Sequence, residues 1–365
     1  MVMFVVRFIV FIAGFAIVAG TFLSAVRTFV LPRSAPDRLT RTIFLLVRRL
    51  FNLVLKRTAS YEDRDRVMAL YAPLALLSMP PVWLICVLIG YMAMFWAIGV
   101  ATLRAAFRIS GSSLLTLGFA PLETLGETIL AYSEATLGLI MVALLIAYLP
   151  TMYSAFQKRE TAVTLLEVRA GSPPSAVEMF LRFQRLKRME KLSELWISWE
   201  IWFAEIEESH TSLPALAFFR SPQPDHSWIT AAGAVLDAAA LAVSTLDIPH
   251  DVQTDLCIRA GYLALRRIAD FFNIVYNPAP TPTNVISISR DEFDEACRQL
   301  EQGGVALKPD RDQAWRDFLG WRVNYDYVLL ALCGLTMAPW APWSSDRSLI
   351  NQRAPLRIPK RQRAS

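Results

Sequence analysis

The stretch Thr116-Leu117-Gly118-Phe119-Ala120 carries its chemistry in the backbone rather than in its side chains. Thr116 supplies the only polar side chain, and Gly118 tolerates the left-handed conformation that turns neighbouring carbonyl groups toward one axis. Carbonyl oxygens arranged in this way can replace the water shell of a dehydrated cation. Because many loops could contain such a pentapeptide, the segments on either side decide its meaning.

Residues of the kinds that build catalytic or metal sites are scattered along the chain. No histidine pair occurs at helical spacing, and no cysteines have a ligand-like or disulfide-like spacing. We therefore expect no enzyme, no resident metal and no organic cofactor, and we expect these side chains to be structural or to lie on the surface. They are His210, His226, His250, Cys86, Cys257, Cys297 and Cys333.

Hydrophobic residues make up 54% of the 365 residues and are unevenly distributed. Residues 1–156 hold the long apolar runs, whereas residues 157–365 mix charged and apolar residues as a soluble helical domain does. The composition therefore predicts a membrane part followed by a soluble part. The net charge of +5 needs no nucleic-acid partner, because basic segments beside a membrane explain it.

The first apolar segment, residues 1–30, exceeds the roughly 20 residues that a membrane helix needs. A cleaved signal peptide is the alternative. The apolar stretch from Phe8 to Val26 is longer than a typical signal-peptide core, and no clean Ala-x-Ala site follows it. We expect a retained transmembrane helix with the N-terminus outside.

Residues 31–66 form a basic linker, which the positive-inside rule places in the cytoplasm. Apolar residues recur in it at three- and four-residue spacing, which predicts an amphipathic helix on the inner leaflet. A soluble helix packed on the C-terminal domain is the alternative. The apolar positions are Leu39, Ile43, Leu46, Leu50 and Leu53, and basic residues include Arg33, Arg38, Arg41, Arg48, Arg49, Lys56 and Arg57.

Two further spans are expected, at Ala72–Ala101 and at Ile129–Phe156. The first contains Pro80-Pro81, which should kink the helix or make it begin afresh. Both spans have their charged ends on the same side, so residues 102–128 lie on the outer side, although their middle is too apolar for an ordinary loop. A segment that enters the membrane and returns satisfies both facts.

This arrangement resembles the pore module of the potassium-channel superfamily, and the resemblance covers residues 67–158. Thr116 to Phe119 match the family's Thr-(Val/Ile/Leu)-Gly-(Tyr/Phe) filter, and residues 104–115 match its pore helix. The resemblance implies that potassium is coordinated by the carbonyl groups of Thr116 to Ala120, with the Thr116 hydroxyl closing the inner site. It also implies a homotetramer, because one loop per chain cannot surround an ion.

Three positions depart from the family pattern. The last filter glycine is Ala120 here, and a left-handed alanine would cost about 1 to 2 kcal/mol. The acidic residue that usually follows the filter is Pro121, and the hydroxyl that usually precedes it is Leu115. We therefore expect a potassium channel or a less selective monovalent cation channel.

Five residues around the filter are candidates for pore function. Glu123 and Glu127 either ring the outer mouth or are ordinary interfacial carboxylates. Glu134 is expected near the cavity or behind the filter, since an ionisable group at that depth usually faces a partner or water. Gly138 is either a gating hinge or a packing glycine, and Pro150 is expected to bend the inner helix.

Residues 159–345 are predicted to form a cytosolic helical domain. Ala176–Ser209 has the pattern of one long amphipathic helix, and its tryptophans Trp196, Trp199 and Trp202 form a stripe typical of a core or a subunit interface. The alanine-rich segment Ala231–Val243 favours close helix packing over a membrane span.

The last apolar segment, Tyr327–Trp343, is too short and too rich in proline to cross a membrane. We expect a buried or interfacial helix that ends in a loop. The basic tail, residues 346–365, is expected to be disordered and to contact anionic lipid headgroups.

The sequence thus predicts an all-α membrane protein in which transmembrane helices and a re-entrant pore loop precede an all-α cytosolic domain. The expected location is the plasma or inner membrane, and the expected partners are potassium, the lipid bilayer and further copies of the chain. The alternative function is a non-conducting membrane sensor or scaffold with a degenerate pore-like fold.

Overall fold

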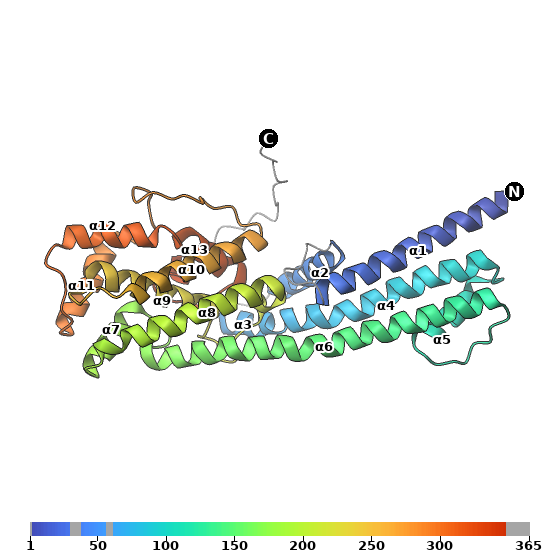
Figure 1. Ribbon diagram of the computed structural model, residues 1–365, viewed down its shortest axis with the longest axis horizontal. Coiled ribbons are helices and arrows are strands. Elements are labelled where there is room, and N and C mark those ends of the chain that lie inside the picture. The colour runs from blue at the N-terminus through green and yellow to red at the C-terminus, as the bar shows by residue number, and fades with distance from the viewer. Residues whose placement is uncertain (1, 30–37, 56–60, 348–365) are drawn as a thin grey trace. The chain divides into compact units, whose positions relative to one another are not determined.

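The computed structural model describes residues 2–29, 38–55 and 61–347, and within them the regular elements are helices (Figure 1). The described residues contain no strand, only an isolated bridge between Leu246 and Leu307. The predicted all-helical class is therefore confirmed. The chain divides into two compact units, Met1–Ser154 and Ala155–Ser365, which we call the first unit and the second unit.

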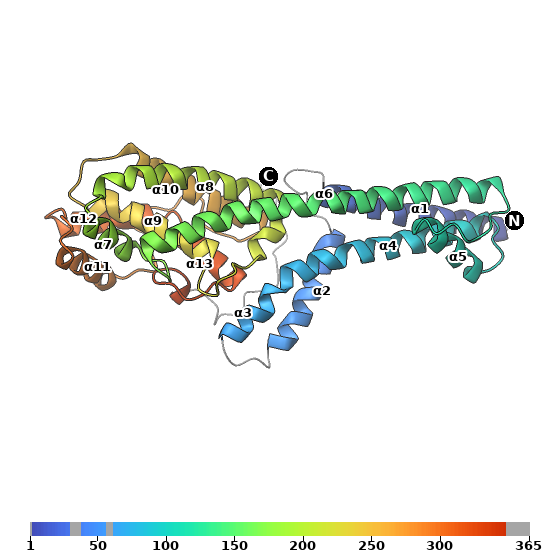
Figure 2. The same cartoon turned by 90° about the horizontal axis from the view of Figure 1, so that it is seen from below.

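In the first unit, α1 and α5 pack against α4, and α2 packs against the N-terminal part of α4 (Figures 1 and 2). The last helix of this unit, α6, continues without a break past the boundary between the units. The helices are α1 (Val2–Phe29), α2 (Arg38–Leu55), α3 (Tyr61–Ala69), α4 (Tyr71–Ile98), α5 (Leu103–Leu114) and α6 (Leu125–Ala170).

Within the described residues, four helices are long and apolar enough to cross a membrane. They are Val2–Phe29, Asp63–Ile98, Leu125–Ala170 and Trp228–Thr245, and 11%, 33%, 22% and 94% of their apolar windows are buried. The first three leave apolar faces uncovered, whereas the fourth is enclosed by the second unit. The helices indicate a multi-pass membrane protein, in agreement with the sequence.

The crossing of α1 and α4 depends on two glycines. A Cβ atom on Gly14 would lie 2.5 Å from the carbonyl oxygen of Gly90, and one on Gly90 would lie 2.6 Å from Val18 Cγ2. Small residues of this kind let two helix backbones approach closely, which is the usual basis of helix association in membranes.

The predicted amphipathic helix of the basic linker is α2, and it packs on the first unit. Ile43 is buried, and the Tyr71 hydroxyl of α4 donates a hydrogen bond to the Phe44 carbonyl at 3.3 Å. The guanidinium carbon of Arg48 lies 5.2 Å from the centre of the Tyr71 ring. The outer apolar positions Leu46, Leu50 and Leu53 are exposed. Arg33, Lys56, Arg57 and the tail from residue 348 onward lie outside the described residues.

Two outcomes were predicted for Pro80-Pro81, a kink or a new start of the helix, and the new start is wrong because α4 runs through both residues. Each proline removes one backbone donor, and the neighbouring turns remain helical. The Ser78 hydroxyl, which donates to the Ala75 carbonyl at 2.7 Å, adds a local hydrogen bond just before them. Prolines are tolerated in apolar helices where neighbouring helices and local adjustments of the backbone compensate for the missing donors.

Helix α6 is longer than the predicted span Ile129–Phe156, because the charged residues that follow continue the helix. It ends at Gly171, whose φ of +82° suits a helix C-terminus. Near the end, Arg159 is 2% exposed and donates to the carbonyls of Leu216 and Phe219 at 2.6 and 2.7 Å. Burial and this adjacent guanidinium group lower the pKa of His210 well below its ordinary value.

Up to residue 347, where the described part of the chain ends, the second unit contains α7 to α13 and three short 3₁₀ helices. Their bounds are α7 (Ala176–Arg185), η1 (Met189–Lys191), α8 (Leu192–Ser212), η2 (Pro214–Phe218), α9 (Trp228–Thr245), α10 (Val252–Phe271), α11 (Arg290–Gln302), α12 (Arg311–Arg322), α13 (Asp326–Thr336) and η3 (Ser345–Arg347).

The single helix predicted at Ala176–Ser209 is instead two helices, α7 and α8. The chain turns between them at Lys187, which has a φ of +54°. The tryptophan stripe on α8 is confirmed as core, because Trp196, Trp199 and Trp202 are each at most 4% exposed. The helical periodicity continues on both sides of this turn, and the turn contains no glycine or proline. The sequence therefore contains no signal that the helix ends there.

At the centre of the second unit, α9 is buried almost from end to end. Its Asp237 contacts the fully buried Arg322 of α12, and the Tyr325 hydroxyl donates to Asp237 Oδ1 at 2.9 Å. Arg322 also donates to Asp326 Oδ1 at 2.8 Å and to the Trp343 carbonyl at 2.6 Å. The predicted buried helix near the C-terminus is α13, and it ends at the left-handed Met337 before Pro339.

Replacing Gly14 by alanine should lower the thermal midpoint of the purified protein, because the added Cβ would meet the Gly90 carbonyl oxygen at 2.5 Å. Forced separation of packed helices costs about 1–3 kcal/mol. Gly20→Ala on the same helix is the matched control, since nothing lies within 4 Å of its Cβ position. Equal midpoints for the two variants, measured in the same detergent, would contradict the close crossing.

Replacing Arg322 by methionine should destabilise the protein by about 3–5 kcal/mol, because the buried Asp237 carboxylate loses its cationic partner. Chemical unfolding followed by tryptophan fluorescence measures the change. Arg298→Met is the control, because its side chain is 65% exposed and pairs only at the surface with Glu295; its effect should stay within about 1 kcal/mol. A similar small effect for both would show that the buried network is not needed.

Candidate functional site

The candidate site is the segment between α5 and α6, residues 115–124. It follows α5, whose first turn is capped by the Thr102 side chain accepting from the Ala105 amide at 3.1 Å. The helix Leu103–Leu114 agrees within one residue with the predicted pore helix 104–115. Ala106, Ile109 and Leu114 are buried and seat this short helix in the first unit.

The chain reverses sharply after α5. Thr116 and Gly118 have φ angles of +55° and +70°, and Leu117 between them does not share this conformation. A left-handed β-branched residue is rare, and such strain clusters at functional sites. The turn is held by the Ser112 carbonyl, which accepts from the Leu117 and Gly118 amides at 2.8 and 3.4 Å.

The side chain of Ser112 holds the next part of the same segment. It is 3% exposed, and its hydroxyl oxygen accepts from the amides of Phe119 and Ala120 at 3.0 and 3.2 Å. The sequence analysis did not predict this role of Ser112. Its position one helical turn before Thr116 is the signal that could have indicated it. Ala120 does not adopt a positive φ, so the expected cost of a left-handed alanine does not arise.

The apolar side chains of this segment point away from the protein interior. Leu115, Leu117 and Phe119 are 55%, 60% and 56% exposed. Thr116 is also exposed, and its hydroxyl donates to the Leu115 carbonyl at 2.8 Å. A row of exposed apolar side chains on a backbone-strained loop is typical of a surface that another chain or a lipid covers.

The carboxylates after the loop have different environments. Glu127 is 8% exposed, and its carboxylate accepts from the Glu123 amide at 2.8 Å while its own amide donates to Thr124 Oγ1 at 3.2 Å. This pattern caps the start of α6. The Glu123 side chain is exposed.

The other three candidate residues on α6 lie further along the helix. Glu134 is completely buried, and Ser110 Oγ of α5 lies 2.5 Å from its Oε1 atom, which places Glu134 on the α5 side of the helix. A Cβ atom on Gly138 would meet the Leu114 carbonyl oxygen at 2.6 Å, so Gly138 is a close-packing position. Pro150 lies inside the continuous helix and is exposed.

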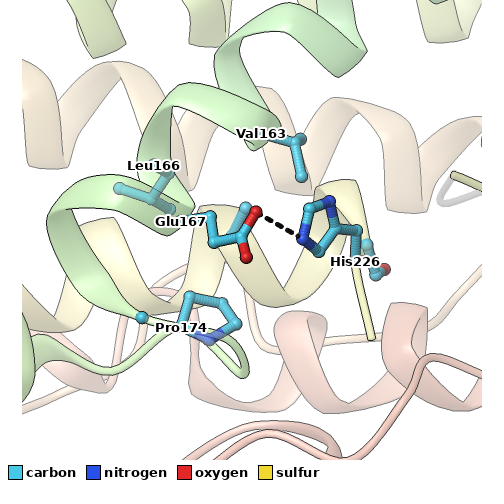
Figure 3. Close-up of a pocket in the computed structure, with 8 residues that line it drawn as sticks. Val163, Leu166, Glu167, Pro174 and His226 are labelled. Carbon is cyan, nitrogen blue, oxygen red and sulfur yellow. Dashed lines mark ion pairs between the residues drawn. The ribbon is translucent and has the colours of Figure 1, made fainter. Parts of the chain in front are cut away.

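The second unit has a separate hollow of about 200 Å³, shown in Figure 3. His226 Nε2 lies 3.1 Å from Glu167 Oε2 at its centre. Ligand pockets usually enclose about 300–1,000 Å³. The 200 Å³ includes open solvent, and the enclosed space is about that of one water molecule, far below this range. The described residues include no cluster of three or more potential metal ligands.

Comparisons with known proteins add no relative to these observations. No protein-family description, no curated protein and no solved structure matches the chain.

Replacing Ser112 by alanine should loosen the loop, because the Phe119 and Ala120 amides lose their acceptor. Backbone amide exchange of the peptide covering residues 115–120 should accelerate by about tenfold, as expected for a lost buried hydrogen bond. Ser113→Ala is the matched control, since the Ser113 hydroxyl donates within its own helix to the Ile109 carbonyl at 2.9 Å. Unchanged exchange in Ser112→Ala would refute the anchoring role.

Proposed function

We propose that the chain is a subunit of a tetrameric potassium channel, or of a less selective monovalent cation channel. The observation that carries the proposal is the strained loop after α5, with positive φ angles at Thr116 and Gly118 and its amides held by Ser112. When the N–H groups of a backbone segment already have hydrogen-bond acceptors within the protein, its carbonyl oxygens can point the other way and coordinate a cation.

The position of the loop supports the proposal. It joins two helices, α4 and α6, that are long and apolar enough to cross a membrane, through the short helix α5. Irregular backbone at membrane depth is tolerated only where protein buries it or where it lines a water-filled path. We infer that α4, α5, the loop and α6 form an outer helix, a pore helix, a filter and an inner helix.

The exposed apolar side chains of the loop support assembly. Leu117 and Phe119 are more than half exposed in the single chain, and neighbouring copies around a four-fold axis would cover them. In this arrangement the carbonyl groups of Thr116 to Ala120 form the ion sites, and Glu123 lies at the outer mouth.

Helix α2, the N-terminus and the second unit also have places in the proposed channel. The arginines of α2 and its exposed residues Leu46, Leu50 and Leu53 suit an interfacial helix on an anionic inner leaflet. The N-terminus then lies outside, and the helical second unit lies in the cytoplasm, where it couples signals to α6.

A non-conducting sensor or scaffold is the second candidate. The observation in its favour is Ala120, which stands where the channel family has a glycine and does not take a left-handed conformation. The outer end of the filter therefore has another geometry, on which conduction depends.

Ion flux from purified protein in liposomes tests the two functions directly. Potassium flux exceeding sodium flux, together with a tetramer in native mass measurement, is the expected result. Silence with both ions from intact tetramers would overturn the channel function and leave the sensor or scaffold.

Replacing Gly118 by alanine should reduce flux by about tenfold, because a left-handed alanine costs about 1–2 kcal/mol at a φ of +70°. Gly111→Ala on α5 is the matched control, since its Cβ would lie 3.9 Å from Leu88 Cδ1, an ordinary contact. Wild-type flux in Gly118→Ala would exclude the loop backbone as the ion path.

A further inference from the structure

Glu134 is a buried acidic group with no cationic side chain paired to it among the described residues. Its side chain is completely buried, its Oε2 atom has no hydrogen-bond partner, and none of the described ion pairs includes it. Burying an unpaired carboxylate in apolar surroundings is strongly unfavourable, so such groups are kept neutral or are paired.

The contacts of Ser110 show which form Glu134 takes. Ser110 Oγ lies 2.5 Å from Glu134 Oε1 and 3.2 Å from the Leu88 carbonyl oxygen. A hydroxyl group has one hydrogen to donate, and the Leu88 carbonyl can only accept. The Ser110 hydroxyl can donate to either acceptor, and it serves both only by sharing its one hydrogen in a weaker three-centre bond. Two full hydrogen bonds form when Glu134 is protonated and donates to Ser110, which in turn donates to Leu88.

This chain of hydrogen bonds joins three helices, with Glu134 on α6, Ser110 on α5 and Leu88 on α4. One turn further along both partners, Gly138 lets α6 approach the Leu114 carbonyl at the end of α5. Two residues after Ser110, the Ser112 hydroxyl holds the amides of Phe119 and Ala120. The same short helix is thus fastened to α6 at one residue and to the loop at another.

We propose that Glu134 is a positioning residue that acts as a neutral carboxylic acid. It fixes α5 between α4 and α6 through Ser110, and α5 in turn sets the geometry of the loop through Ser112. This inference rests on the proposed channel function for its effect on ion selectivity, but the fastening itself is a property of the fold.

The decisive comparison is Glu134→Gln against Glu134→Leu. Glutamine has nearly the shape of the neutral acid and keeps a donor for Ser110, whereas leucine keeps only the volume. Glu134→Gln should retain the wild-type ratio of potassium to sodium flux and the wild-type amide exchange at residues 115–120. Glu134→Leu should lower the flux ratio and accelerate that exchange by about tenfold.

Ser110→Ala removes the middle of the same chain and should reproduce both effects of Glu134→Leu. Ser113→Ala is its control, because that hydroxyl bonds only within α5. Tetramer content and thermal midpoint are measured for each variant to check that it folds. If Glu134→Leu does not fold, the comparison of Ser110→Ala with Glu134→Gln decides the test.

Two results would overturn the inference. Loop exchange at the wild-type rate in both Glu134→Leu and Ser110→Ala would show that the fastening does not reach the loop. A Glu134→Gln variant as impaired as Glu134→Leu would show that the charged form is needed. If the wild-type protein carries no ion flux, the channel function fails by itself, and amide exchange alone then decides the role of Glu134.

Discussion

The loop after α5 depends on one constraint: the backbone amides of a chain that reverses sharply at the end of a helix need new hydrogen-bond acceptors. Ser112 meets this constraint, because its carbonyl oxygen and its hydroxyl oxygen each accept hydrogen bonds from two amides of the loop. Ser112 can do so only if α5 is held in place. The seating of α5 by Ser110, Leu114 and its apolar face is therefore as important as the loop sequence.

Much of this arrangement could be predicted because it follows from periodicity and length. The apolar runs of α1, α4 and α6, the short helix before the loop and the left-handed Gly118 all have local causes in the sequence. The contacts that hold the loop have no such local cause. Ser112 looks like many other serines, and the burial of Glu134 against Ser110 requires two helices to meet in three dimensions.

The errors in the predicted elements have physical causes of the same kind. The chain turns at Lys187 without glycine or proline, so periodicity alone joined α7 and α8 into one helix. Pro80 and Pro81 remove backbone donors without ending α4, which runs through both and packs against α1. At α4, the packing of the helix outweighs the local preference of the prolines.

Asp237 has a consequence beyond its contact with Arg322. It lies at the middle of α9, a helix that is apolar enough to be mistaken for a membrane span during synthesis. An aspartate at the centre of a segment opposes membrane insertion by about 2.5–3.5 kcal/mol. The residue that contacts Arg322 in the core of the second unit therefore also makes α9 less favourable as a membrane span than its apolar composition suggests.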